Sequence, residues 1–185
     1  MSVPPAAGER PLEQRVRAWI EPYWNAEHLV RTLHWLLEVE PAAGEALRVA
    51  ALTHDMERHF PGGPQADLER PADEPEYRSA HSERSAHIVA DWLRKEEVER
   101  ELVERTEELI RLHEVGGTPE ADLLQAADSL SFLEVNDGLV AGWVREGRCS
   151  PERGREQHRW MFERIRVPAA RTLAEPLLER ALARI

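Results

Sequence analysis

The sequence predicts an all-α protein: a single-domain bundle of seven to eight helices. Segments rich in Ala, Leu, Glu and Arg carry apolar residues three and four positions apart, which is helical spacing. Short loops containing Pro and Gly separate these segments. No window combines two-residue alternation with β-branched enrichment, so a sheet is not expected. The 185 residues suffice for one domain with a proper core.

Eight helical segments follow one another along the chain. The third contains the run from Ala46 to Leu52, is apolar nearly all round, and is expected at the centre of the bundle. The expected ranges are 11–20, 25–38, 45–59, 76–95, 97–113, 119–135, 151–166 and 168–185.

Local signals mark several helix ends. Thr118–Pro119–Glu120 combines an N-cap, a proline at the first helical position and an acid in the first turn, and Ser150–Pro151–Glu152 repeats this start. Gly138 and Gly142 are expected to loosen the segment between these two helices. Pro176 is expected to kink or split the last helix.

Composition and charge limit the classes of function. The formal net charge is −11, from 35 acidic and 24 basic side chains, so neither nucleic acid nor a membrane is expected as a partner. A small anionic substrate stays compatible, because a metal site reverses the field locally. There is no membrane-spanning stretch or signal peptide, and Cys149 is the single cysteine, so we expect a cytoplasmic protein.

The adjacent pair His54–Asp55 stands at the end of the most apolar helix. Imidazole and carboxylate are both good ligands for divalent metal ions. Neighbours on a helix point roughly 100° apart, so this pair converges on metal only at a helix end, or if the carboxylate leans across or bridges two ions. Taken alone, the dipeptide fits equally well a helix-terminal histidine beside a solvated aspartate.

Four further residues extend the pair into an ordered series; they are His28, His81, His113 and Asp128. Over about residues 27–136, this series resembles the pattern of the HD-domain superfamily of all-α, metal-dependent proteins. The resemblance implies one HD-type domain over residues 1–185, with a core at about 25–136 and a helical extension over 137–185. It also implies that the six residues hold two divalent transition-metal ions bridged by Asp55. Fe, Mn, Co, Ni and Zn all tolerate this ligand chemistry.

Asp128 has support of its own, because it lies on an apolar stripe with Leu124 and Ser131 and so needs either a cation or a water-exposed groove. The remaining histidines fit less well. His34 is turned roughly 240° from His28 around the same helix, so His28 is preferred over His34 as the first ligand. His87 is turned in the same way from His81. His59 and His158 are expected at the surface or behind the ligands.

Three arginines follow a proposed ligand by three residues and share its helix face: Arg31, Arg58 and Arg84. Each could bind a substrate phosphate or simply pair with a surface acid. Arg58 and Arg84, with His81 and His113, form the expected catalytic set. Glu57 and Glu114 are candidates for a general base or for orienting a ligand histidine.

Most HD proteins hydrolyse phosphomonoesters, nucleotides or phosphoanhydrides, so the resemblance implies a metal-dependent phosphohydrolase. Its substrate would be a small phosphorylated molecule or nucleotide, attacked by a hydroxide that the metal activates. The later histidines and Asp128 are similar to the branch that cleaves diadenosine polyphosphates, but residues 133–136 lack its basic Pro-x-x-Arg stretch. The proline-rich segment 61–75 is expected to form a long loop that gates or shapes the pocket.

Two alternatives remain open. Some HD proteins load two irons and oxidise a C–H bond with oxygen, and Tyr23 and Glu27 before His28 are similar to a feature of one such group. The other alternative is a module that binds a nucleotide or a partner without turnover. The last two helices could also supply a homodimer face.

Overall fold

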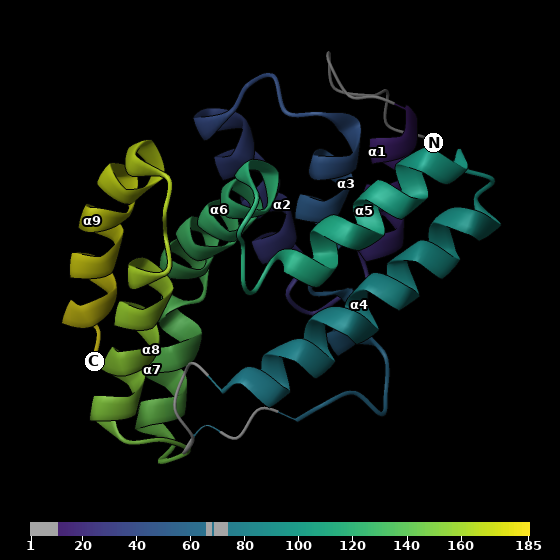
Figure 1. Ribbon diagram of the computed structural model, residues 1–185. Helices are drawn as coiled ribbons and strands as arrows, with labels where there is room; N and C mark the ends of the chain where they lie inside the picture. The colour runs from purple at the N-terminus through teal and green to yellow at the C-terminus, as the bar shows by residue number, and fades with distance from the viewer. Residues whose placement is uncertain (1–10, 66–67, 69–73) are drawn as a thin grey trace, which may run out of the picture.

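The computed structural model describes residues 11–65, 68 and 74–185, and within them the chain forms nine α-helices, one 3₁₀-helix and no strand (Figure 1). The all-α prediction is therefore confirmed, with more helices than the seven or eight expected. None of the described helices has both the length and the apolarity that crossing a membrane requires. The helices are α1 (Pro11–Ile20), α2 (Ala26–Val39), α3 (Glu45–Thr53), η1 (Met56–His59), α4 (Pro75–Lys95), α5 (Arg100–Leu112), α6 (Pro119–Val135), α7 (Asp137–Arg145), α8 (Pro151–Glu163) and α9 (Pro168–Ala183).

Helix α6 lies between two apolar cores. It packs against α2 on the side of the main core and against α8 and α9 on the other side. Leu124 belongs to the core shared with α1 to α5, whereas Leu130 and Leu133 belong to the core shared with α8 and α9. Full burial of such a leucine contributes about 1.5–3 kcal/mol. In Figure 1, α7, α8 and α9 gather on the side of the molecule opposite α1. A polar side chain on a buried face of α6 therefore needs a buried partner, and Asp128 is such a side chain.

The two helix-start signals in the sequence act as expected. The Thr118 hydroxyl accepts a hydrogen bond from the backbone N–H of Ala121 at 3.2 Å, and α6 begins at Pro119. The Ser150 hydroxyl accepts one from the backbone N–H of Arg153, also at 3.2 Å, and α8 begins directly after it. Each cap satisfies one of the four N–H groups that a helix leaves free at its start.

The third helix ends earlier than predicted, and this early end determines where the His–Asp pair points. Helix α3 stops at Thr53 instead of continuing to His59, and His54 takes its C-cap position. Asp55 has φ −101° and ψ 7°, outside the α-helical range, and η1 follows it. Because the regular helix is broken here, ligand atoms of His54 and Asp55 come within 4.8 Å of each other.

The segment after α6 is helical, which corrects the expectation that Gly138 and Gly142 would loosen it. A glycine inside a helix costs about 1 kcal/mol relative to alanine. Burial of Val140 where α7 packs on α8 offsets that cost. Tertiary packing therefore overrides the local preference.

Two other helix boundaries differ from the prediction. Helix α9 continues past Pro176, so the expected split does not occur. Helix α5 begins at Arg100 rather than Glu97, because Glu97 has a φ of 56°, which a right-handed helix cannot include.

His158 on α8 is buried, so of the two expected positions, at the surface or behind the ligands, the surface one is wrong. Its ring centroid lies 6.0 Å from that of Phe132. Neither ring nitrogen has a hydrogen-bond partner among the described residues. Burial lowers the pKa of His158 to about 4, and the charge of Asp137 counteracts only part of this effect. The imidazole is therefore neutral in the folded protein at neutral pH.

We predict that His158 makes the protein sensitive to acid. Its folded-state pKa of about 4 lies below the ordinary 6.5, so the unfolded chain binds the proton more readily. Stability is fully present above pH 6.5 and falls as the pH decreases, by about 2 kcal/mol at pH 5. Denaturant unfolding of the wild type and His158→Leu at pH 8 and pH 5 should show a smaller loss in the variant. Equal losses would show that other groups carry the acid sensitivity.

Candidate metal centre

The six residues predicted as metal ligands lie together and are all buried. They come from five parts of the fold: α2 (His28), the end of α3 (His54, Asp55), α4 (His81), the end of α5 (His113) and α6 (Asp128). The four imidazole rings form a row in which neighbouring centroids are 5.1–5.4 Å apart. Segments distant in sequence thus bring six buried side chains of metal-ligating type to one place.

Two sets of potential ligand atoms can be distinguished, and Asp55 belongs to both. One set is His28, His54 and Asp55, and the other is Asp55, His81 and His113. Asp128 adds a carboxylate to the first set, because its Oδ1 lies 3.1 Å from His28 Nε2 and 3.4 Å from His54 Nε2. The shared position of Asp55 suits a carboxylate that contacts two ions.

A hydrogen bond at Nδ1 fixes each of the four imidazoles. The acceptors are Ser131 Oγ for His28 (2.9 Å), Ala51 O for His54 (3.2 Å), Glu57 Oε1 for His81 (2.9 Å) and Ile110 O for His113 (2.7 Å). Carbonyl and carboxylate oxygens only accept, so these Nδ1 atoms carry the proton. The Ser131 hydroxyl donates to the carbonyl of His28, so its oxygen accepts from His28 as well. In the neutral form of each ring, which is the form that binds metal, Nε2 then presents a lone pair.

These lone pairs face carboxylate oxygens, which are also acceptors. The Nε2 atoms of His54, His81 and His113 are buried without a hydrogen-bond partner among the described residues. Oδ1 of Asp55 nevertheless lies only 2.9 Å from His81 Nε2. Buried acceptors so close to one another repel unless a proton or a metal ion lies between them. The donor set and its arrangement thus fit divalent metal ions.

Arginines neutralise the negative charge of the buried carboxylates Asp55 and Asp128 at the oxygens that do not face the histidines. Arg58 Nε lies 3.2 Å from Asp55 Oδ2, and Arg164 pairs with Asp128 Oδ2. Burial raises the pKa of both aspartates, but these arginines and the neighbouring histidines more than offset it and hold both pKa values well below the ordinary range. The aspartates are therefore ionised, as ligands must be.

Glu114 does not suit the role of general base that the sequence allowed. Its Oε2 accepts hydrogen bonds from both Arg78 and Arg164, each at 2.6 Å. Burial raises its pKa, but Arg164, His113 and Arg78 together lower it to about 2. A carboxylate held this tightly in its ionised form is a poor proton acceptor near pH 7.

Glu57 and Arg84 act together behind His81. Glu57 is buried and accepts from His81 Nδ1 through Oε1 and from Arg84 Nη1 through Oε2 at 3.1 Å. Arg84 Nη2 donates to the carbonyl of Pro61 at 2.7 Å. Arg84 is not among the described residues that line the cavity beside the cluster, and its contact with substrate stays a prediction. The spacing correctly placed Arg84 on the same helix face as His81. Its guanidinium, however, donates hydrogen bonds to Glu57 and to the Pro61 carbonyl at the start of the loop.

The other candidates from the sequence lie outside the cluster. Arg31 makes a two-point ion pair with Glu134 through Nε (2.8 Å) and Nη2 (2.6 Å), so it is not free to bind a phosphate. His34 is exposed, which leaves His28 as the first ligand candidate. His87 and His59 are likewise exposed.

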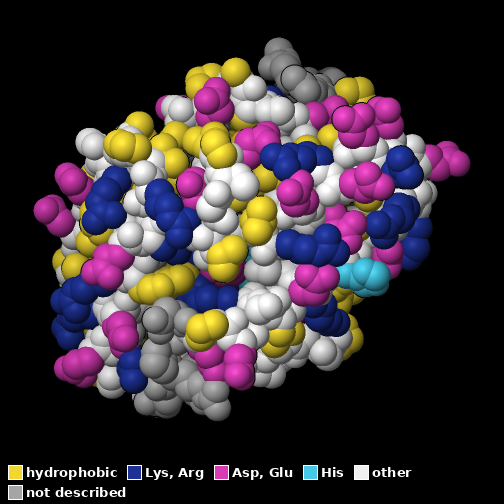
Figure 2. All heavy atoms as spheres, in the orientation of Figure 1, with side chains coloured by type: hydrophobic (Ala, Val, Ile, Leu, Met, Phe, Trp, Pro, Cys, Tyr) yellow, Lys and Arg dark blue, Asp and Glu magenta, His cyan; other side chains and the backbone are white. Residues whose placement is uncertain are grey.

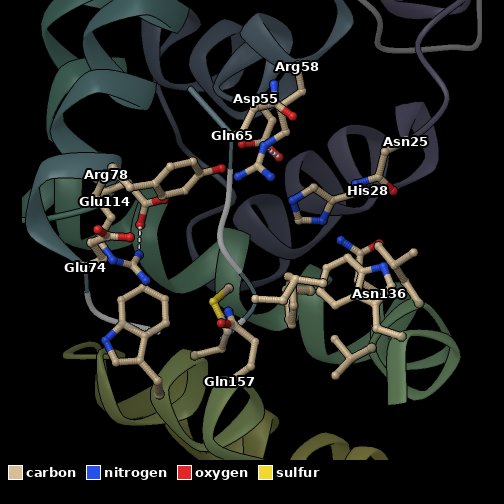
Figure 3. A pocket seen from close by; sticks show the side chains of 18 of the residues that line it. Asn25, His28, Asp55, Arg58, Gln65, Glu74, Arg78, Glu114, Asn136 and Gln157 are labelled. Atoms are coloured by element: carbon tan, nitrogen blue, oxygen red, sulfur yellow. Dashed lines mark hydrogen bonds and ion pairs between the residues drawn. The ribbon is translucent and has the colours of Figure 1, made fainter. Parts of the chain in front are cut away.

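A cavity of about 400 Å³ opens beside the cluster (Figure 3). Asp55, Arg58 and His28 lie on one side of it, and Gln157 of α8 lies on the other side of the view. Residues 63–65 and 68 also line it, as expected of a segment that shapes the pocket, whereas residues 66–67 and 69–73 of that segment lie outside the described residues.

The lining of this cavity is rich in arginine. On the face shown in Figure 2, acidic and basic side chains are interspersed. Five lining residues are arginines: Arg58, Arg78, Arg148, Arg153 and Arg164. Only Arg58 was singled out from the sequence. Arg164 is 36 residues from Asp128, so only the general need of Asp128 for a cation pointed to such a partner.

The fold and the site define the chain as an all-α protein with a buried His/Asp cluster that could hold metal ions. The profile of the family described as Domain of unknown function (DUF4202) matches residues 12–139, more than half of the chain, and the chain belongs to this family. No curated protein and no solved structure matches the chain. The matched region contains all six residues of the cluster, whereas α8 and α9 lie beyond it.

We expect the wild type to bind two divalent ions per chain and the His54→Ala, Asp55→Ala double variant to bind none. Asp55 belongs to both sets of ligand atoms, so its loss affects both ions. Metal content by mass spectrometry, after loading and desalting, measures this directly. His87→Ala, altered at an exposed histidine, should keep both ions. A wild type that binds no ion under any loading condition would contradict the metal centre.

Glu57→Gln should lower the affinity of the protein for one metal ion and leave the affinity for the other unchanged. The substitution keeps the shape of the side chain but removes the charge that orients His81, and the loss of such a partner costs about 10–100-fold in metal affinity. Calorimetric titration with Mn²⁺ resolves the two affinities. Glu134→Gln is the matched control, because Glu134 binds Arg31 and Trp35 away from the cluster. Two unchanged affinities would show that Glu57 does not position His81.

Proposed function

We propose that this protein is a metal-dependent phosphohydrolase acting on a small phosphorylated substrate. The observation that carries the proposal is the convergence of four imidazole lone pairs on two ionised carboxylates beside a cavity. The order of these residues along the chain is the one that resembles HD-domain phosphohydrolases.

The residues divide into two holding sets. His28, His54 and Asp128 would hold one ion and His81 with His113 the other, while Asp55 contacts both. Divalent ions in such a pair lower the pKa of water and offset charge on a phosphoryl oxygen. The second set has fewer protein ligands among the described residues, so more coordination positions of its ion would stay open, whereas His28, Asp55 and Asp128 line the cavity.

The charge of the cavity supports an anionic substrate. Near the cluster, Asp55, Glu114 and Asp128 are balanced by three arginines, which are Arg58, Arg78 and Arg164. Metal ions added to a cluster that is already balanced make the cavity positive. A positive, largely enclosed site concentrates anions even in a protein of net charge −11.

Arg58 is placed to contact the phosphoryl group. Its Nε lies 3.2 Å from Asp55 Oδ2, 34% of its side chain is exposed, and the residue lines the cavity. A guanidinium held at one nitrogen can donate from the others to phosphoryl oxygens. His81 and His113 act as ligands, with His81 oriented by Glu57.

A diiron oxygenase is the second candidate, and one observation favours it. The Tyr23 side chain is buried, and its pKa is raised first by burial and then by the charge of nearby Asp55. A tyrosine close to the cluster fits the oxygenase reading. Glu27, the other residue of that reading, is exposed.

Phosphate release from a panel of phosphomonoesters, nucleotides and pyrophosphate tests the proposal, with the protein loaded with Mn, Fe, Co, Ni or Zn. We expect turnover that disappears in Asp55→Ala, and a fall in kcat/KM of about 10–100-fold in Arg58→Met, because a charge-assisted contact is lost. Arg31→Met, altered at an arginine outside the cavity, should match the wild type.

An oxygen electrode run on the iron-loaded protein completes the test. Oxygen uptake without phosphate release would replace hydrolysis by oxygenation. Neither activity, with two ions bound, would leave a binding module.

A further inference from the structure

Two guanidinium groups contact the ring of Trp160 at the cavity wall. Cζ of Arg78, on α4, lies 3.4 Å from the ring centroid, and Cζ of Arg164 lies 4.5 Å from it. Both side chains are nearly buried, with 12% and 7% of their surface exposed. Stacking on an aromatic face holds a guanidinium plane in one orientation.

The two arginines differ in how far their donors are used. Arg164 donates from all three nitrogens, to Ser129 Oγ, Glu114 Oε2 and Asp128 Oδ2. Arg78 donates from Nη1 to the same Glu114 oxygen, and its Nε is buried with no partner among the described residues. Arg164 is therefore a saturated structural contact, whereas Arg78 keeps unused donor capacity.

Glu114 is shared by both cations, and Asp128 is a second counter-charge for Arg164 alone. A single carboxylate oxygen receives both Nη1 bonds. Burial lowers the pKa of Arg78, and the Glu114 carboxylate counteracts this only in part. A buried cation with an unmet donor is stabilised by an additional anion.

The free edge of Arg78 has a specific chemistry. With Nη1 engaged, the Nε and Nη2 donors remain, and their parallel N–H groups match two oxygens of one oxyanion. Arg78 lines the cavity beside Glu114, which directly follows the ligand candidate His113 (Figure 3). An oxyanion bound there would lie next to the metal-ligand cluster.

We infer that Arg78 recognises a phosphoryl oxyanion of the ligand, held in place by Trp160 and Glu114. The inference rests on the proposed function only in taking the oxyanion to be phosphoryl. It gives the specificity role to Arg78 instead of Arg84, whose guanidinium is held by Glu57 and the loop. Arg58 and Arg78 would then contact the substrate from two sides.

Inorganic phosphate is the probe, titrated calorimetrically into the Mn²⁺-loaded full chain. Arg78→Met should raise the Kd for phosphate by about 10–100-fold, as expected for a lost charge-assisted contact. Arg78→Lys keeps a charge opposite Glu114 but lacks the two-donor edge, so its Kd should lie between those of the wild type and Arg78→Met. Arg31→Met is the matched control and should bind phosphate as the wild type does.

Two further readouts separate recognition from a structural role. Metal affinity and melting temperature should be unchanged in Arg78→Lys, and KM for any hydrolysed ester should rise more than kcat falls. Equal phosphate affinity in Arg78→Met and the wild type would overturn the inference, and so would a loss of phosphate binding that follows a loss of bound metal.

The outcomes also distinguish this inference from the proposed function. If no ester is hydrolysed but phosphate binding depends on Arg78, hydrolysis fails and the recognition site stands. If esters are hydrolysed and Arg78→Met and Arg78→Lys bind phosphate normally, the inference alone fails.

Discussion

The hydrogen bonds at the Nδ1 atoms of four buried histidines are the constraint on which the rest of the centre depends. Without them each imidazole could rotate or change tautomer, and the Nε2 lone pairs would not converge. Two of the acceptors, the carbonyls of Ala51 and Ile110, belong to the last turns of α3 and α5, where helices leave carbonyls free. The ends of these helices therefore orient His54 and His113, and the Ile110 carbonyl accepts from the backbone N–H of His113 as well as from its ring.

The position of α6 between two cores explains the chemistry around Asp128. An ionised carboxylate there is largely shielded from water and costs several kcal/mol unless it is paired. The structure pairs it twice, with Arg164 on one oxygen and with imidazoles on the other. The second pairing is complete only with a cation between the acceptors. The same burial that stabilises the fold thus creates the demand for a positive charge at the site.

Much of this arrangement follows from local sequence signals, and the remainder depends on long-range packing. The caps at Thr118 and Ser150 and the apolar stripe around Asp128 are visible in short windows, because helix periodicity and capping are local. The partners Arg78 and Arg164 are not, because each meets Glu114 through tertiary contact between separate helices. Sequence spacing predicted correctly that Arg84 lies on the same helix face as His81. It could not predict that the Arg84 guanidinium donates a hydrogen bond to Glu57.

The family match ends at residue 139, near the start of α7, whereas the cavity wall continues as far as Arg164. The candidate ligand residues and much of the cavity wall facing them are therefore encoded by consecutive, separable stretches of the chain. Mutations in the later stretch can reshape what enters the cavity while the cluster keeps its geometry. Arg164 limits that freedom, because it belongs to the later stretch and yet contacts Asp128 directly. A related protein in which the sequence of α8 has changed must keep a positive side chain next to Asp128, or supply one from another part of the chain.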